Sequence, residues 1–222
     1  MTVPTPEQLT TLTRTGAATV GESGGRAMRA RIRPMWPGAA VAGEVVPVRC
    51  APGDNLAIHV AAATAPPGSV LVVEITGDPE LGHWGEVLAT QARARGIAGL
   101  VIDGGVRDVA ALERLGFPVF ATMLALRGAA KVADGSVGEP VTVGDVLVEP
   151  GDVVVGDADG VTIVPGADLD AVIAAAEARE AKELAMFDAL RAGATTLDLL
   201  GLDGSRIRQS RSSRGGAGRS RS

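Results

Sequence analysis

The middle of the chain alternates short apolar runs with segments of helical periodicity. The apolar runs predict buried strands over residues 70–75, 98–102 and 117–121. Helices are expected over residues 55–64, where Asp54 and Asn55 can cap the start, and over residues 85–95 and 108–115. Strands that alternate with helices are typical of a parallel or mixed sheet. Another strand is expected over residues 39–50, and its proline favours a place at the sheet edge.

The pattern changes toward both ends of the chain. Residues 7–20 are expected to form one short amphipathic helix. Residues 140–165 contain strand and turn signals, with Asp157 and Asp159 in a hairpin turn, and residues 167–191 predict a long helix. These elements indicate a compact single-domain α/β fold with a mixed sheet, a second β-rich layer and a long C-terminal helix.

Composition narrows the class of protein. Hydrophobic residues make up 46% of the chain but aromatic residues only 2%, so the core is expected to consist of Val, Leu, Ile and Ala. The single Cys50 cannot form an internal disulfide, which favours a reducing, cytoplasmic location, and it is assigned no catalysis. No apolar run approaches the ~20 residues that span a bilayer, so no membrane partner is expected. The glycine-rich fingerprints of dinucleotide and P-loop sites are absent.

Charge is unevenly distributed along the chain. The net charge is −5, yet residues 205–222 contain six Arg and no acidic residue, so the rest of the chain carries −11. An acidic body disfavours nucleic acid as the main partner. The Arg/Ser/Gly-rich segment cannot bury a core, so we expect one domain over residues 1–203 and a disordered tail over residues 204–222.

Charged residues follow directly after the buried strand 98–102, in the stretch GLVIDGGVRD. That strand is apolar on both faces, which is typical of a central strand, and ligands bind beyond the carboxyl ends of such strands. Gly104 and Gly105 would let a ligand approach closely. Arg107 offers a planar fork for a carboxylate or ketone oxygen, and Asp108 a hard oxygen for Mg²⁺ or Mn²⁺. The alternative is a tight turn with a surface Arg–Asp pair.

The sequence Gly82-His83-Trp84-Gly85-Glu86 lies at the start of the helix 85–95. The first turn of a helix presents unpaired N–H groups and the positive end of the helix dipole, which together can hold an anionic substrate. Glu86 could cap these groups or reach a metal, or it could merely complement the dipole.

The stretch WGEVLATQARARGIAGLVIDGGVRDVAALERLGFPVFA (84–121) resembles a family that contains two kinds of protein. They are the 4-hydroxy-4-methyl-2-oxoglutarate/4-carboxy-4-hydroxy-2-oxoadipate aldolases and the regulator of ribonuclease E activity A. Segments 52–75, 131–165 and 195–202 support the resemblance, which covers roughly residues 7–202. The family's marker is an acid, twenty residues and then Arg-Asp, and here Glu86 and Arg107-Asp108 have that spacing.

The resemblance implies a layered β/β/α, swivelling-domain-like fold and a divalent cation, Mg²⁺ or else Mn²⁺ or another, bound by Asp108. It implies that Arg107 contacts the pyruvate part of the substrate. It also implies that the backbone of Val87 and Leu88, with Gly85 beside them, holds the pyruvate carboxylate. Glu86 would help to hold water on the metal, although aldolase members commonly have aspartate there.

The resemblance further implies an acid supplied by the C-terminal helix of a neighbouring subunit. At 100° per residue one stripe of the long helix contains Leu169, Val172, Ile173, Ala176, Leu184 and Phe187. Glu180 and Glu183 fall within the stripe, where an acid needs a partner or a wet cavity. Glu183 is favoured, Glu180 comes second, and Glu177 stays open; acids at the rim of a broad amphipathic helix are the alternative. A shared site predicts a homotrimer or a dimer of trimers.

Other polar residues are assigned lesser roles. We expect His59 to be a satisfied packing residue rather than a ligand. His83 could touch the substrate, but a solvated loop residue is expected. Asp103 is expected to orient Arg107 or water on the metal. Arg127 and Lys131 could attract an anionic substrate at the site mouth, or be ordinary surface charges.

The sequence thus predicts a divalent-metal-dependent (class II) aldolase. It would cleave a 4-hydroxy-2-oxo acid such as 4-hydroxy-4-methyl-2-oxoglutarate to pyruvate, with oxaloacetate decarboxylation as a side reaction. A Schiff-base mechanism is disfavoured because the motif region has no lysine. The alternatives are a non-catalytic regulator that binds a ribonuclease and a different small-acid lyase on the same scaffold.

Overall fold

A mixed sheet organises the computed structural model, which describes residues 3–208. Its strand order is β1-β13-β12-β3-β4-β5-β7-β2, with β9 paired to β3. The bounds are Arg26–Ala27 (β1), Arg33–Pro34 (β2), Val41–Cys50 (β3), Val70–Ile75 (β4), Gly99–Ile102 (β5), Val119–Ala121 (β7), Gly135–Val137 (β9), Val153–Gly156 (β12) and Val161–Val164 (β13). Strands β3, β4, β5 and β7 are parallel to one another, whereas β12, β13, β1, β9 and β2 pair antiparallel with their neighbours.

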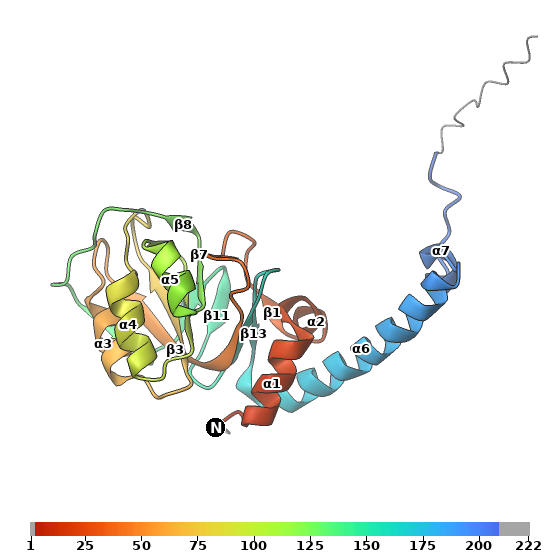
Figure 1. Ribbon diagram of the computed structural model, residues 1–222, viewed down its shortest axis with the longest axis horizontal. Coiled ribbons are helices and arrows are strands. Elements are labelled where there is room, and N and C mark those ends of the chain that lie inside the picture. Colours follow the sequence, from red (N-terminus) through yellow and green to blue (C-terminus); the bar gives the residue numbers. More distant parts are fainter. Residues whose placement is uncertain (1–2, 209–222) are drawn as a thin grey trace, which may run out of the picture. The chain divides into compact units, whose positions relative to one another are not determined.

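Strands β5 and β7 and most of β4 are buried on both faces, and the two faces meet different layers. Helices α3 (Leu56–Thr64), α4 (Glu86–Ala94) and α5 (Val109–Leu115) lie together on one face (Figure 1). Leu71 and Leu100 pack toward these helices, whereas Val72 and Val101 pack toward a hairpin of β10 (Val141–Val143) and β11 (Val146–Val148). Successive strand residues point to opposite faces, so a continuous apolar run fills both cores. The predicted layered α/β fold is confirmed.

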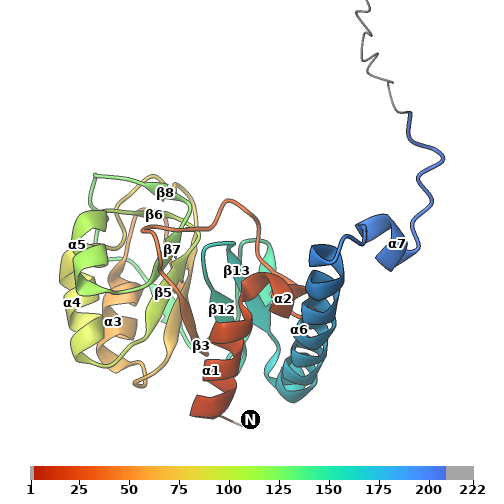
Figure 2. The same ribbon diagram turned by 45° about the vertical axis from the view of Figure 1, so that its right-hand side comes forward.

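A third core forms over β12 and β13. Helices α1 (Pro6–Thr15) and α2 (Ala17–Glu22) and the first turns of α6 (Leu169–Arg191) pack there (Figure 2). The prediction of one helix over residues 7–20 is wrong, because Gly16 has φ 84° and ends α1. The hairpin turn predicted around Asp157 is present between β12 and β13, and the Asp157 carboxylate accepts from the Ala17 N–H at 2.7 Å.

The prediction that residues 39–50 form an edge strand is also wrong. Strand β3 is central, with β4 on one side and β12 followed by β9 on the other. The Pro47 carbonyl accepts from Gly138 on that second side, and the N and C=O of a strand residue point the same way. On that side the pairing with β12 ends at Glu44 and the pairing with β9 begins at Val48. Pro47 lies between the two, so its lack of an N–H group interrupts neither pairing.

The chain divides into two compact units, Met1–Glu180 and Ala181–Ser222, and the boundary falls within α6. In the first unit the predicted stripe of α6 is borne out, since Leu169, Val172 and Ala176 are buried. In the second unit Leu184 and Phe187 are exposed, and a short helix α7 (Thr196–Leu200) follows with a Thr195–Asp198 capping box. Of the helices described, none is long and apolar enough to cross a membrane. Most of the predicted tail, residues 209–222, lies outside the described residues.

Candidate active site

The loops that follow four parallel strands converge at the carboxyl ends of those strands. Isolated parallel bridges join Asp54 to Ala130, Gly82 to Gly128, and Trp84 to Val106. A short parallel pair, β6 (Gly105–Val106) and β8 (Met123–Leu124), adds a further connection. In open α/β sheets this edge is where ligands bind.

A pocket of about 250 Å³ lies among these loops. It is lined by Asn55, His59, Gly82, His83, Gly85, Val87, Leu88, Arg107, Asp108, Gly128, Ala129 and Lys131. Five predicted site residues are thereby brought together, namely Gly85, Val87, Leu88, Arg107 and Asp108. Glu86 is exposed and is not part of the pocket wall. Glu183 belongs to the second unit, and its role stays a prediction.

Asp108 connects the two halves of the predicted motif. Its Oδ2 accepts from the Glu86 backbone N–H at 3.0 Å and lies 3.7 Å from Nε of Arg107. The residue adopts the left-handed conformation (φ 60°), which aspartate tolerates better than most residues. Because first-turn amides have no intrahelical acceptor, the N–H groups of Val87 and Leu88 are available to an anion.

Arg107 is held by its backbone and by small neighbours. Its N–H donates to the Trp84 carbonyl at 2.9 Å, and Nη1 lies 3.5 Å from the Leu126 carbonyl. Gly82 and Gly85 lie against the side chain, so no side-chain atom from either position displaces it. The guanidinium therefore lies beside the first turn of α4, where a carboxylate and an adjacent ketone can be bound together.

Neutral and cationic groups line another part of the pocket. His59 is not the satisfied packing residue that was predicted, because its buried Nε2 has no hydrogen-bond partner among the described residues. Burial and the nearby Lys131 lower the pKa of His59, so its imidazole is neutral at pH 7. The Lys131 ammonium donates to the Ala129 carbonyl at 3.2 Å, which places it at the pocket.

His83 is completely buried, and the prediction of a solvated loop residue is wrong. Backbone hydrogen bonds hold His83 in the interior. Its N–H donates to the carbonyls of Leu81 and Gly105, and its carbonyl accepts from the Asn55 side chain at 2.7 Å. Neither ring nitrogen has a hydrogen-bond partner in residues 3–208. Burial lowers the pKa of His83, and the nearby carbonyls of Leu81 and Gly105 only partly oppose that shift.

Asp103 does not orient Arg107. Its carboxylate binds Nε of Arg31 at 3.0 Å and Nη2 at 2.7 Å, and it also accepts from the Gly144 N–H at 3.0 Å. Asp103 thus ties the end of β5 to the turn of the β10–β11 hairpin. Arg127 is likewise engaged elsewhere, 3.3 Å from Asp78.

Asn55 and His59 were missed as pocket residues because β3 was expected at the sheet edge. Once β3 is central, the segment after it joins the ligand-binding edge. A second signal was available in Gly82 and Gly128, because glycines in loops after parallel strands mark close approach of the backbone.

Asp108, the carboxylate that lines this pocket, could hold a hydrated hard cation. Within residues 3–208, no group of three or more His, Cys, Asp or Glu side chains is placed to hold one ion. Mg²⁺ keeps several waters and often binds through one or two carboxylates. With Oδ2 bonded to the Glu86 N–H, Oδ1 of Asp108 is the oxygen that would hold such a cation.

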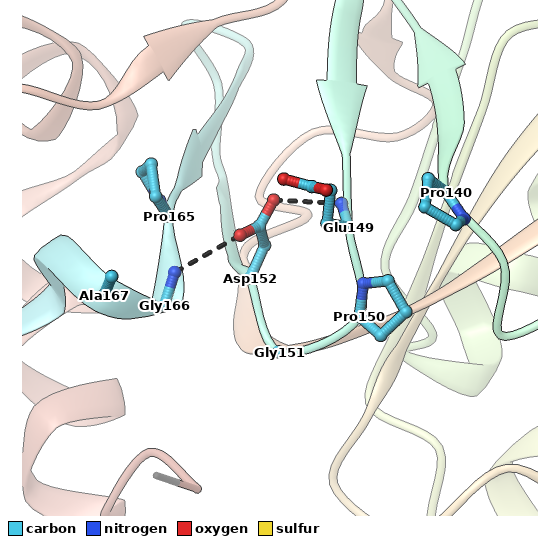
Figure 3. Close-up of a pocket in the computed structure, with 8 residues that line it drawn as sticks. All are labelled: Pro140, Glu149, Pro150, Gly151, Asp152, Pro165, Gly166 and Ala167. Atoms are coloured by element: carbon cyan, nitrogen blue, oxygen red, sulfur yellow. Dashed lines mark hydrogen bonds between the residues drawn. The ribbon is translucent and has the colours of Figure 1, made fainter. Parts of the chain in front are cut away.

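A larger cavity of about 690 Å³ lies elsewhere (Figure 3). Three prolines and two acids contribute to its wall. The Asp152 carboxylate is satisfied by the N–H groups of Glu149 at 3.0 Å and Gly166 at 3.2 Å. Because no His, Cys, Lys or Arg lines this cavity, size does not make it the better candidate.

Comparisons to known proteins identify the family and the fold of the chain. The chain belongs to the RraA-like family (Aldolase/RraA), whose model matches residues 17–163. A Halalkalibacterium halodurans protein provisionally named 4-hydroxy-4-methyl-2-oxoglutarate aldolase is 36% identical over 152 residues, covering 68% of this chain and 72% of the relative.

Two solved structures share the fold. Streptomyces coelicolor RraAS2, described as an unusual member of the RNase ES inhibitor RraA protein family, is 27% identical with a TM-score of 0.72, covering 82% of this chain and 96% of the other. An uncharacterized protein from Pseudomonas syringae pv. tomato is 25% identical with a TM-score of 0.77, covering 87% and 92%.

Proposed function

We propose that the protein is a divalent-metal-dependent aldolase. It would cleave a 4-hydroxy-2-oxo acid such as 4-hydroxy-4-methyl-2-oxoglutarate to pyruvate in the cytoplasm, and would decarboxylate oxaloacetate as a side reaction. The observation that carries the proposal is the meeting of Arg107, Asp108 and the first turn of α4 in one pocket. The aldolase relative supports the same reaction class.

Binding would use the α4 N-terminus and Arg107. The N–H groups of Val87 and Leu88 would hold the C1 carboxylate, assisted by the helix dipole. The Arg107 guanidinium would lie against the 2-oxo oxygen, which becomes negative as the reaction proceeds. Asp108 would hold a divalent cation, which supplies Lewis-acid polarisation of the 2-oxo group when bound. Lys131, His59 and Asn55 would contact the distal part of the substrate.

Cleavage would begin with loss of the proton of the 4-hydroxyl group. Glu86, acting through water, or a neighbouring subunit's Glu183 would accept that proton. The C3–C4 bond then breaks, C4 becomes a carbonyl, and the bonding electrons pass to the pyruvate enolate beside Arg107. Protonation of C3 completes pyruvate. With oxaloacetate the C3–C4 bond also breaks, carbon dioxide leaves, and the same enolate forms.

Exposed apolar residues around the pocket support a shared site in a homotrimer or dimer of trimers. Val87, Leu126 and Val132 are 78%, 86% and 86% exposed. Apolar side chains clustered at a polar pocket are typical of a surface covered by a partner. Among the candidate acids, Glu180 accepts from Arg14 of its own chain at 2.7 Å, and Glu183 stays the acid proposed to enter the neighbouring site.

The test is pyruvate release from 4-hydroxy-4-methyl-2-oxoglutarate and from oxaloacetate, with Mg²⁺ or with EDTA. We expect Arg107→Ala to lower kcat/KM roughly 100- to 1,000-fold, the usual effect of removing one electrostatic contact to a developing oxyanion. Asp108→Ala should lower it by a similar factor, because the cation that polarises the 2-oxo group would lose its protein ligand. Absence of pyruvate release by the wild-type protein from any hydroxy-oxo acid would refute the proposal. A rate that survives EDTA would refute metal dependence alone.

The competing function is a regulator that binds a ribonuclease. It is favoured by the similarity to RraAS2, whose family is described as RNase ES inhibitors. A wild-type protein without lyase activity that binds and inhibits a ribonuclease would establish it. Activity on another small acid, with loss in Arg107→Ala, would indicate a different lyase on the same scaffold.

A further inference from the structure

Asp54 is a buried carboxylate that joins two segments of the pocket without lining it. Only 2% of the residue is exposed. Its Oδ1 accepts from the Leu56 N–H at 2.7 Å, at the start of α3. Its Oδ2 accepts from the N–H groups of Val132 at 2.6 Å and Ala133 at 3.0 Å.

Each of the two segments carries pocket residues. Helix α3 and its start carry Asn55 and His59, and the loop that Asp54 binds carries Ala129 and Lys131. Backbone bonds support the same junction, because Asn55 N–H donates to the Ala130 carbonyl at 2.9 Å. The junction therefore connects the segment that carries His59 to the segment that carries Lys131.

Apart from Asp54, the loop is anchored here by the backbone hydrogen bonds of Ala130 with Gly53 and Asn55. Lys131 and Val132 are both exposed, so hydrophobic burial does not hold them in place. Burial raises the pKa of Asp54, but the three N–H donors and Lys131 outweigh burial and lower that pKa overall, so the carboxylate is charged. Hydrogen bonds to a charged acceptor are roughly twice as strong as neutral ones.

We infer that Asp54 is a positioning residue that holds the Lys131 loop against α3 and so completes the part of the pocket that receives the distal end of the substrate. The inference rests on the proposed function for its kinetic consequence. Asp54 touches no substrate and acts through Lys131, Asn55 and His59.

The informative variant is Asp54→Asn, which keeps the shape. Its single carbonyl oxygen can serve Leu56 or the pair Val132 and Ala133, whereas its NH₂ group would oppose the N–H groups at the other end. We expect KM for 4-hydroxy-4-methyl-2-oxoglutarate to rise about tenfold while kcat changes less than threefold. In a Lys131→Ala background the same change should raise KM no further, because the two residues act as one unit.

The matched control is Asp152→Asn. Asp152 is an equally buried carboxylate, 5% exposed, that also binds two backbone N–H groups but lines the other cavity. Both variants should lose stability, and only Asp54→Asn should change KM. An unchanged KM in Asp54→Asn, or an equal rise in Asp152→Asn, would overturn the inference.

Amide hydrogen exchange separates this inference from the proposed function. Exchange at Val132 and Ala133 should accelerate at least tenfold in Asp54→Asn and stay unchanged in Asp152→Asn. If Asp54→Asn does not fold, Ala133→Pro removes one of the donors and should raise KM in the same way. Failure of the wild type to release pyruvate would refute the aldolase proposal, and the exchange comparison would still decide whether Asp54 holds the loop.

Discussion

At the scale of single residues, the site depends on its glycines as much as on its charged side chains. Gly85 has an extended backbone (φ −165°) that any residue adopts, so its conformation does not require glycine. The surrounding space does require glycine, because a Cβ atom at this position would collide with Oδ2 of Asp108 and lie 3.1 Å from Cγ of Arg107. A Cβ at Gly82 would lie 2.6 Å from the Ala125 carbonyl oxygen and 3.0 Å from Cδ of Arg107.

We therefore expect Gly85→Ala to displace Asp108 and Arg107 and to lower kcat/KM by at least tenfold while the protein stays folded. Steady-state pyruvate release and circular dichroism measure the two effects. The control is Gly204→Ala, where a Cβ atom meets nothing within 4 Å, and activity should be unchanged. A fully active Gly85→Ala protein would contradict the assignment of Arg107 and Asp108 to the reaction.

At the scale of elements, strands were predicted well where the pattern is local and poorly where a partner decides. The run 70–75 matches β4 because its apolar residues face two cores whatever lies next to them. Pro47 misled the prediction for β3, because its position between two partner strands is a property of the assembled sheet. The start of α2 likewise has a distant partner, because the Ala17 N–H donates to Asp157, 140 residues away.

Asp157 also provides a test at this scale. Removing its carboxylate in Asp157→Ala leaves the first N–H of α2 without its acceptor, so the free energy of unfolding should fall by about 1 kcal/mol, as for loss of a helix cap. Urea denaturation measures this. Asp159→Ala is the control, since Asp159 contributes only its backbone N–H to the same turn, and a loss of equal size there would contradict the capping role.

At the scale of the whole molecule, the apolar residues around the pocket predict an assembly. Sedimentation equilibrium should give a trimer or a dimer of trimers. Leu126→Glu, which places a charge on a residue 86% exposed in the single chain, should dissociate the assembly and lower activity more than tenfold. Leu147→Glu, on the separate β10–β11 hairpin, should leave both unchanged. A fully active monomer would refute a site shared between subunits.

Local spacing and periodicity were sufficient to predict the layered fold and the place of Gly85, Arg107 and Asp108. The ends of strands and the starts of helices depend mainly on residues that are close together in the sequence. Only the tertiary structure decided which distant groups meet. Asp103 binds Arg31 across 72 residues, and Asp54 binds Val132 across 78. The sequence does not show which donor a carboxylate binds, because that donor is brought to it only by the folded path of the chain.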